Sequence, residues 1–106
     1  ANTRGQIIRE YFIGARRIDL LVKWPWELAG QRQVQREAIE LKVWRPNQTD
    51  PLNQGLVKLN AYLNGLSLTS GTLIIFDRRH NLPPLEERVT REFLDYQDKR
   101  IQVIRG

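Results

Sequence analysis

One segment of this chain has the periodicity of an amphipathic helix, and it stands among segments with the periodicity of strands. Its stripe of leucines at i, i+4, i+7 and i+11 consists of Leu52, Leu56, Leu59 and Leu63. Thr49 or Asp50 can cap this helix, which is expected to begin near Pro51, and Gly65 is expected at its C-terminal end. A single helix crossing between strands predicts a mixed α/β domain.

The other segments read as strands because they are rich in β-branched and aromatic residues or alternate between apolar and polar residues. The expected strands are residues 7–13, 17–24, 35–44, 72–77, 90–96 and 100–104. The first three are expected to form an antiparallel meander, with a polar loop over 25–33. The nearly continuous apolar run at 72–77 predicts a strand buried on both faces. The last two read as a hairpin, although 90–96 could instead be helical.

The predicted fold is therefore a mixed central sheet in the order β-β-β-α-β, followed by a C-terminal hairpin. A length of 106 residues predicts one domain, spanning 1–106. The chain contains no Met and begins at Ala1, so we expect it to be a fragment of a longer protein.

The composition of the chain indicates which kinds of partner and which cellular compartment to expect. Lys and Arg number 17 against 12 Asp and Glu, which gives a net charge of +5. A basic domain attracts polyanions, so nucleic acid is the expected partner, although a positive solvated surface explains the charge equally well. No apolar run is long enough for a membrane span. The chain has no Cys, which fits the cytoplasm and excludes thiolate metal sites.

Three charged residues interrupt two of the expected strands. Glu40 and Lys42 are two residues apart, so they share one face of their strand. If the second and third strands pair, Asp19 faces Glu40 across the ladder with Cβ atoms roughly 5 Å apart. Two carboxylates this close repel by about 4 kcal/mol at an effective dielectric constant of 20, and a bound cation relieves that repulsion.

Paired carboxylates form an oxygen-rich site suited to Mg²⁺ or Mn²⁺, with the carbonyl of Leu41 as a further ligand. A metal at such a site polarises a phosphate and lowers the pKa of bound water. The ammonium of Lys42 can stabilise the charge that develops on the phosphate or position the attacking water. The residues also have a simpler interpretation, because Glu-x-Lys triplets are common and exposed strands carry such charges to discourage aggregation.

Four segments in the same order carry a family resemblance: GARRIDLLV at 14–22, AIELKVW at 38–44, the helix segment at 55–63, and GTLIIFD at 71–77. The chain resembles the PD-(D/E)XK nuclease superfamily, and more narrowly the nuclease-like domain found C-terminal to AAA-type ATPase domains. The resemblance implies a restriction-endonuclease-like core and an ATPase domain in the parent chain. It also implies that Asp19 and Glu40 bind Mg²⁺ and that Lys42 assists catalysis.

Two features depart from that family. Similar domains have a helix before the first strand, and this helix is expected to be missing here. Lys58 stands where Gln is usual, on a stripe with Gln54 and Tyr62 beside the leucines. The residues expected to contact nucleic acid are Arg16, Arg17, Lys58, Arg78 and Arg79. A surface lysine is the slightly favoured interpretation of Lys58, and Arg16 and Arg17 could equally be ordinary strand charges.

The sequence supports more than one function. The favoured one is Mg²⁺-dependent hydrolysis of phosphodiesters in nucleic acid, with DNA favoured over RNA. The alternative is a catalytically inactive module of the same fold that binds nucleic acid or docks a partner. A sheet without a covering helix also exposes apolar surface, which predicts a homodimer.

Overall fold

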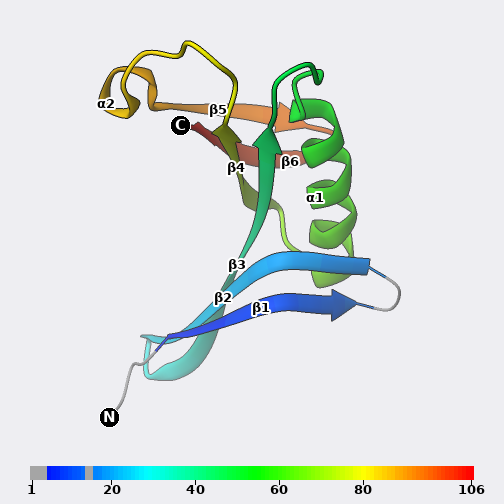
Figure 1. The fold of residues 1–106 in the computed structure, drawn as a ribbon. Coiled ribbons are helices and arrows are strands. Elements are labelled where there is room, and N and C mark those ends of the chain that lie inside the picture. Colours follow the sequence, from blue (N-terminus) through cyan, green and yellow to red (C-terminus); the bar gives the residue numbers. More distant parts are fainter. Residues whose placement is uncertain (1–4, 14–15) are drawn as a thin grey trace.

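A twisted six-stranded sheet and one long helix make up most of the molecule (Figure 1). The computed structural model describes residues 5–13 and 16–106, without the side chains of 10–13, 16, 24, 26 and 28. The strands are β1 (Gln6–Ile13), β2 (Arg16–Leu28), β3 (Gln31–Trp44), β4 (Ser70–Asp77), β5 (Thr90–Tyr96) and β6 (Lys99–Arg105). The helices are α1 (Leu52–Leu66) and the short α2 (Leu85–Arg88), which the sequence did not predict. Neither described helix is long and apolar enough to cross a membrane.

The strands lie in the order β1-β2-β3-β4-β6-β5. The pairs β1–β2 and β2–β3 are antiparallel, which confirms the predicted meander. Across α1 the direction changes, because β3–β4 and β4–β6 are parallel pairs. The hairpin of β5 and β6 closes the sheet. The predicted mixed α/β class and the order of its elements are thus confirmed.

The predicted polar loop over 25–33 is wrong, because β2 and β3 continue as a two-stranded ribbon that turns at Ala29 and Gly30. Both turn residues have positive φ, 53° and 77°, as a two-residue hairpin turn requires. Pro25 pairs with Val34 of β3 and lies beyond Lys23, the last residue of β2 that pairs with a described residue of β1. Its missing N–H therefore breaks no ladder with the described part of β1.

Helix α1 begins where the sequence predicted and ends later. The Leu52 N–H donates to Asp50 Oδ1 at 3.0 Å, so Asp50 satisfies one of the free N–H groups of the first turn. The predicted end at Gly65 is wrong. Leu66 is still buried, and the left-handed residue that ends the helix is Ser67, with φ 57°. The Leu68 N–H then donates to the Leu63 carbonyl at 2.9 Å, which closes the C-terminal turn.

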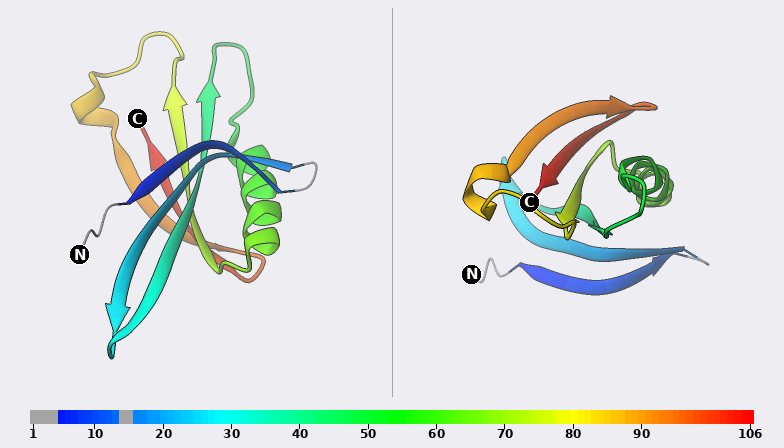
Figure 2. Two further views of the ribbon diagram at one scale, coloured as in Figure 1. Left: turned by 90° about the horizontal axis from the view of Figure 1, so that it is seen from below. Right: turned by 45° about the horizontal axis from the view of Figure 1, so that its top comes forward.

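The core lies between α1 and one face of the sheet, which curves around the helix (Figure 2). Leu59 and Leu63 of α1 are fully buried, as are Leu73 and Ile75 of β4. Side chains on the opposite face are less covered: Ile74 is half-buried and Phe76 is 41% exposed. The prediction that this strand is buried on both faces is therefore wrong, because among the described helices only α1 packs flat against the sheet.

Candidate active site

The ladder between β2 and β3 ends next to the predicted acidic residues. The last backbone pair is Leu20 with Ile39, so the same register sets Asp19 opposite Glu40. Beyond this pair a side chain takes the place of a backbone acceptor, because the Leu41 N–H donates to Asp19 Oδ2 at 2.9 Å. The structure thus brings Asp19 and Glu40 together, as the strand pairing predicted.

Glu40 is the most deeply buried charged residue described, with none of its side chain exposed. It lies on the face of β3 that packs against α1, where its paired neighbour on β4 is Leu73. Lys58 Nζ approaches Glu40 Oε2 to 3.0 Å as an ion pair. That contact lacks hydrogen-bond geometry, so both oxygens of Glu40 are buried without a donor among the described residues. A carboxylate in this state is strongly under-satisfied.

The pKa values of the two carboxyl groups are shifted in opposite directions. Burial, followed by the hydrogen bond with Asp19, raises the pKa of Glu40 from 4.5 to about 7, and Lys58 opposes this rise. Burial would also raise the pKa of Asp19, but the hydrogen bonds from Glu40 and from the Leu41 N–H outweigh it. Together with Lys58 and Arg17 they hold the pKa of Asp19 below its usual value. Near pH 6 Glu40 is therefore mostly protonated while Asp19 is ionised.

The donor set fits a small hard cation. A backbone N–H and C=O of one strand residue point to the same edge, so the Leu41 carbonyl points toward the side where its N–H meets Asp19. Two carboxylates and this carbonyl leave room for water ligands, as Mg²⁺ prefers. Among the described side chains, which do not include that of Glu10, no group of three or more His, Cys, Asp or Glu is suited to a metal. The described groups that could hold a metal here are the carboxylates of Asp19 and Glu40 and the carbonyl of Leu41.

Lys42 lies two residues beyond Glu40 on the same face and makes no hydrogen bond or ion pair with another described residue. It lines a mostly polar pocket of about 610 Å³ between the end of β3 and the start of α1. Arg45, Gln48 and Gln54 line the same pocket. The structure therefore places the predicted catalytic lysine on the strand face that carries Glu40 and beside a polar pocket, where no described group pairs with its ammonium.

The predicted nucleic-acid contacts do not form one surface. Arg17 is 3.8 Å from Asp19, and Lys58 contacts Glu40, so both belong to the carboxylate site. Arg16 begins β2, but its side chain lies outside the described ones. Arg78 and Arg79 lie after β4, at the far end of the parallel strands.

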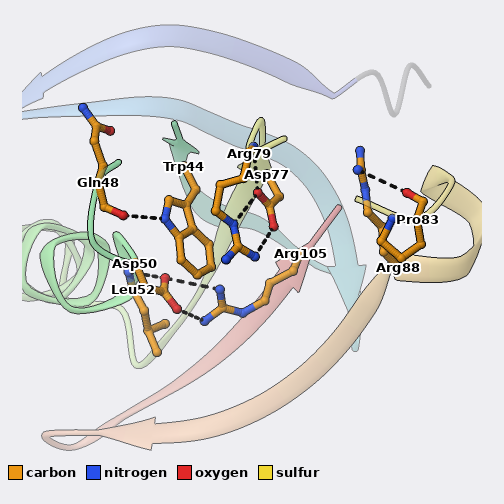
Figure 3. A network of polar contacts seen from close by, with 9 residues as sticks. All are labelled: Trp44, Gln48, Asp50, Leu52, Asp77, Arg79, Pro83, Arg88 and Arg105. Atoms are coloured by element: carbon orange, nitrogen blue, oxygen red, sulfur yellow. Dashed lines mark hydrogen bonds and ion pairs between the residues drawn. The ribbon is translucent and has the colours of Figure 1, made fainter. Parts of the chain in front are cut away.

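At that end, arginines gather around Trp44 (Figure 3). The Arg79 guanidinium lies 3.5 Å from the centre of the Trp44 ring and makes two hydrogen bonds to the carboxylate of Asp77. Arg105 approaches the same ring to 5.9 Å and pairs with Asp50 at 2.9 Å. Each guanidinium already has a carboxylate partner. The cluster therefore links the strand ends to the start of α1, and its positive charge is largely neutralised.

Sequence reasoning missed the contact of Lys58 with Glu40. A signal was present, because Lys58 and Tyr62 are four residues apart on a stripe that borders the buried leucines. In the structure Tyr62 is buried, and the centre of its ring lies 6.0 Å from Lys58 Nζ. Burial raises the pKa of Tyr62.

Comparison with known proteins adds no identification. The chain matches no protein-family model, no curated protein and no solved structure.

Proposed function

We propose that this chain is a Mg²⁺-dependent phosphodiesterase that acts on nucleic acid, with DNA as the favoured substrate. One observation carries the proposal: a fully buried Glu40 with two unsatisfied oxygens faces Asp19 at the end of a strand ladder. A fold retains so costly an arrangement where the carboxylates serve a purpose that an apolar pair could not.

Each residue has a distinct task in this proposal. Asp19 and Glu40 would hold the metal, with the Leu41 carbonyl beside them. The metal, when bound, supplies Lewis-acid activation of the phosphate and of a water molecule. The Leu41 N–H fixes the orientation of the Asp19 carboxylate. Lys42 extends into the adjacent polar pocket, where its ammonium can neutralise charge on a phosphate oxygen.

The proposal includes a restriction-endonuclease-like core for the fold. An antiparallel β1–β2–β3 meander, the crossover helix α1 and a parallel β4 support that assignment. The predicted ATPase domain of a longer parent chain and the predicted homodimer stay predictions. The half-covered sheet face around Ile74 and Phe76 favours the homodimer.

The test is a cleavage assay on supercoiled and linear DNA with Mg²⁺ or Mn²⁺. Asp19→Asn, Glu40→Gln and Lys42→Ala should each lower the rate by at least about 100-fold, the usual effect of losing a group that stabilises the transition state. Glu37→Gln is the matched control, because it removes an exposed carboxylate from the same strand. Wild-type rates in both Asp19→Asn and Lys42→Ala would refute the proposed active site.

A second function is favoured by the contact between Lys58 and Glu40. With a lysine ammonium beside Glu40, the buried charge is already partly compensated without a metal. The chain would then be a catalytically inactive module that binds nucleic acid through its net charge of +5. DNA binding that weakens with salt, together with no cleavage in either metal, would support this alternative over the enzyme.

A further inference from the structure

Lys58 reaches the carboxylate site from the helix side. It projects from α1 toward β3 and contacts Glu40 Oε2 at 3.0 Å, while 32% of its own side chain stays exposed. The Lys58 ammonium therefore contacts the buried carboxylate, while part of the same side chain is exposed to solvent. Tyr62 is one helical turn further along α1, and the centre of its buried ring lies 6.0 Å from Lys58 Nζ.

The position of this ammonium bears directly on metal binding. A Mg²⁺ ion binds carboxylate oxygens at about 2.0–2.1 Å, which is closer than an ammonium approaches them. An ammonium at 3.0 Å from Oε2 occupies space beside one of the two Glu40 oxygens that a metal could bind. Two cations on one buried carboxylate would repel each other strongly, because a site away from water screens charge poorly.

We propose that Lys58 is a built-in counter-ion that competes with the divalent metal for Glu40, and so sets the affinity of the site for metal. This inference rests on the proposed function in one respect, namely that Asp19 and Glu40 bind metal. Lys58 can leave because its four-carbon stem is flexible and partly exposed. The metal then binds only at the cost of moving the lysine, which lowers its apparent affinity.

The experiment is a calorimetric Mn²⁺ titration of the wild type and of Lys58→Gln at one pH. Lys58→Gln should bind Mn²⁺ at least about tenfold more tightly, because the competing charge is gone. Arg32→Gln is the matched control: it removes one positive charge from an exposed residue at the other end of β3, and its affinity should stay within about threefold of the wild type. The double variant Lys58→Gln/Glu40→Gln should lose the gain.

A second measurement does not depend on whether Lys58→Gln folds. In the wild type with ¹³C-labelled lysine, Mg²⁺ should shift the Cε resonance of Lys58, assigned with Lys58→Arg, and leave most other lysines in place. A saturated metal site with an unmoved Lys58 resonance would overturn the inference. So would equal Mn²⁺ affinities of wild type and Lys58→Gln, an equal gain in Arg32→Gln, or no binding in any of the proteins.

The outcomes separate this inference from the proposed function. Tighter Mn²⁺ binding by Lys58→Gln without DNA cleavage would support the counter-ion and refute the nuclease. Cleavage that depends on Asp19 and Glu40, with Mn²⁺ affinity unchanged by Lys58→Gln, would support the nuclease and refute the counter-ion.

Discussion

Replacement of Glu40 by Gln should change how the stability of the protein depends on pH. The pKa of Glu40 is about 7 in the folded protein and 4.5 in the unfolded reference. Between these values the folded state binds more protons than the unfolded state, so the free energy of unfolding falls as pH rises. The stabilising effect of the proton is fully present below pH 4.5 and is lost as pH passes through about 7.

The magnitude follows from the size of the pKa difference. A separation of 7 − 4.5 = 2.5 pKa units, at about 1.4 kcal/mol per unit, corresponds to about 3 kcal/mol at pH 8 and above. Gln has nearly the shape of a protonated Glu and carries no charge. The Glu40→Gln variant should therefore match the wild type within about 1 kcal/mol at pH 5 and exceed it by about 2–3 kcal/mol at pH 8.

Urea denaturation at pH 5, 6, 7 and 8, in a buffer with a metal chelator, measures this difference. Other groups that titrate in this range contribute equally to both proteins, so subtraction isolates Glu40. Asp19 does not interfere, because its lowered pKa places its titration below 3.8. There its stabilising contribution is lost as pH falls. Glu37→Gln, on the exposed side of β3, should run parallel to the wild type. Parallel curves for Glu40→Gln and wild type would refute the buried, proton-linked state of Glu40.

Three further changes test the packing around the site by chemical denaturation. Gly55→Ala should destabilise the protein by about 1–2 kcal/mol despite the better helix propensity of Ala, because the new Cβ would lie 2.6 Å from Leu73 Cδ1 in the core; the exposed Asn53→Ala on the same helix should not. Leu59→Ala should cost about 2–5 kcal/mol, since Leu59 is fully buried between α1 and the sheet, and a loss below 1 kcal/mol would contradict that packing. Asp50→Ala should cost about 1 kcal/mol, because it removes the acceptor of the Leu52 N–H and the partner of Arg105; an unchanged midpoint would show that neither contact contributes.

The sequence predicted the parts of the fold that depend on local chemistry. Periodicity placed six strands and α1 in the observed order, and the side chain of Asp50 accepts the N–H that a capping residue was expected to take. Pairing of the second and third strands was enough to set Asp19 opposite Glu40. The errors fall where tertiary contacts override local signals. Pro25 continues a strand because it pairs with Val34 of β3, and α1 extends past Gly65 because Leu66 is buried in the core.

The burial of Glu40 shows why such a site is hard to predict from one strand alone. Alternation along β3 separates Ile39 and Leu41 from Glu40 and Lys42, and on hydrophobicity the first set would be the core face. The neighbouring strands decide otherwise. Leu73 and Ile75 of β4 and Ile101 and Val103 of β6 are the fully buried set on their strands, and the parallel register brings Glu40 and Lys42 onto their face. Helix α1 covers this face, so the carboxylate of Glu40 is buried in the most apolar part of the sheet.

An apolar residue at position 40 would satisfy the same core without the pH-dependent cost of about 3 kcal/mol derived above. The chain instead has Glu40 there, sets a second carboxylate opposite it, and supplies Lys58 from the covering helix. Local features that oppose the packing of their surroundings are concentrated at functional sites. If Glu40 had only a structural role, the stabilising Glu40→Gln change would leave DNA cleavage and metal affinity intact. If the site is functional, the same change raises stability at pH 8 and abolishes both, so one variant separates the two explanations.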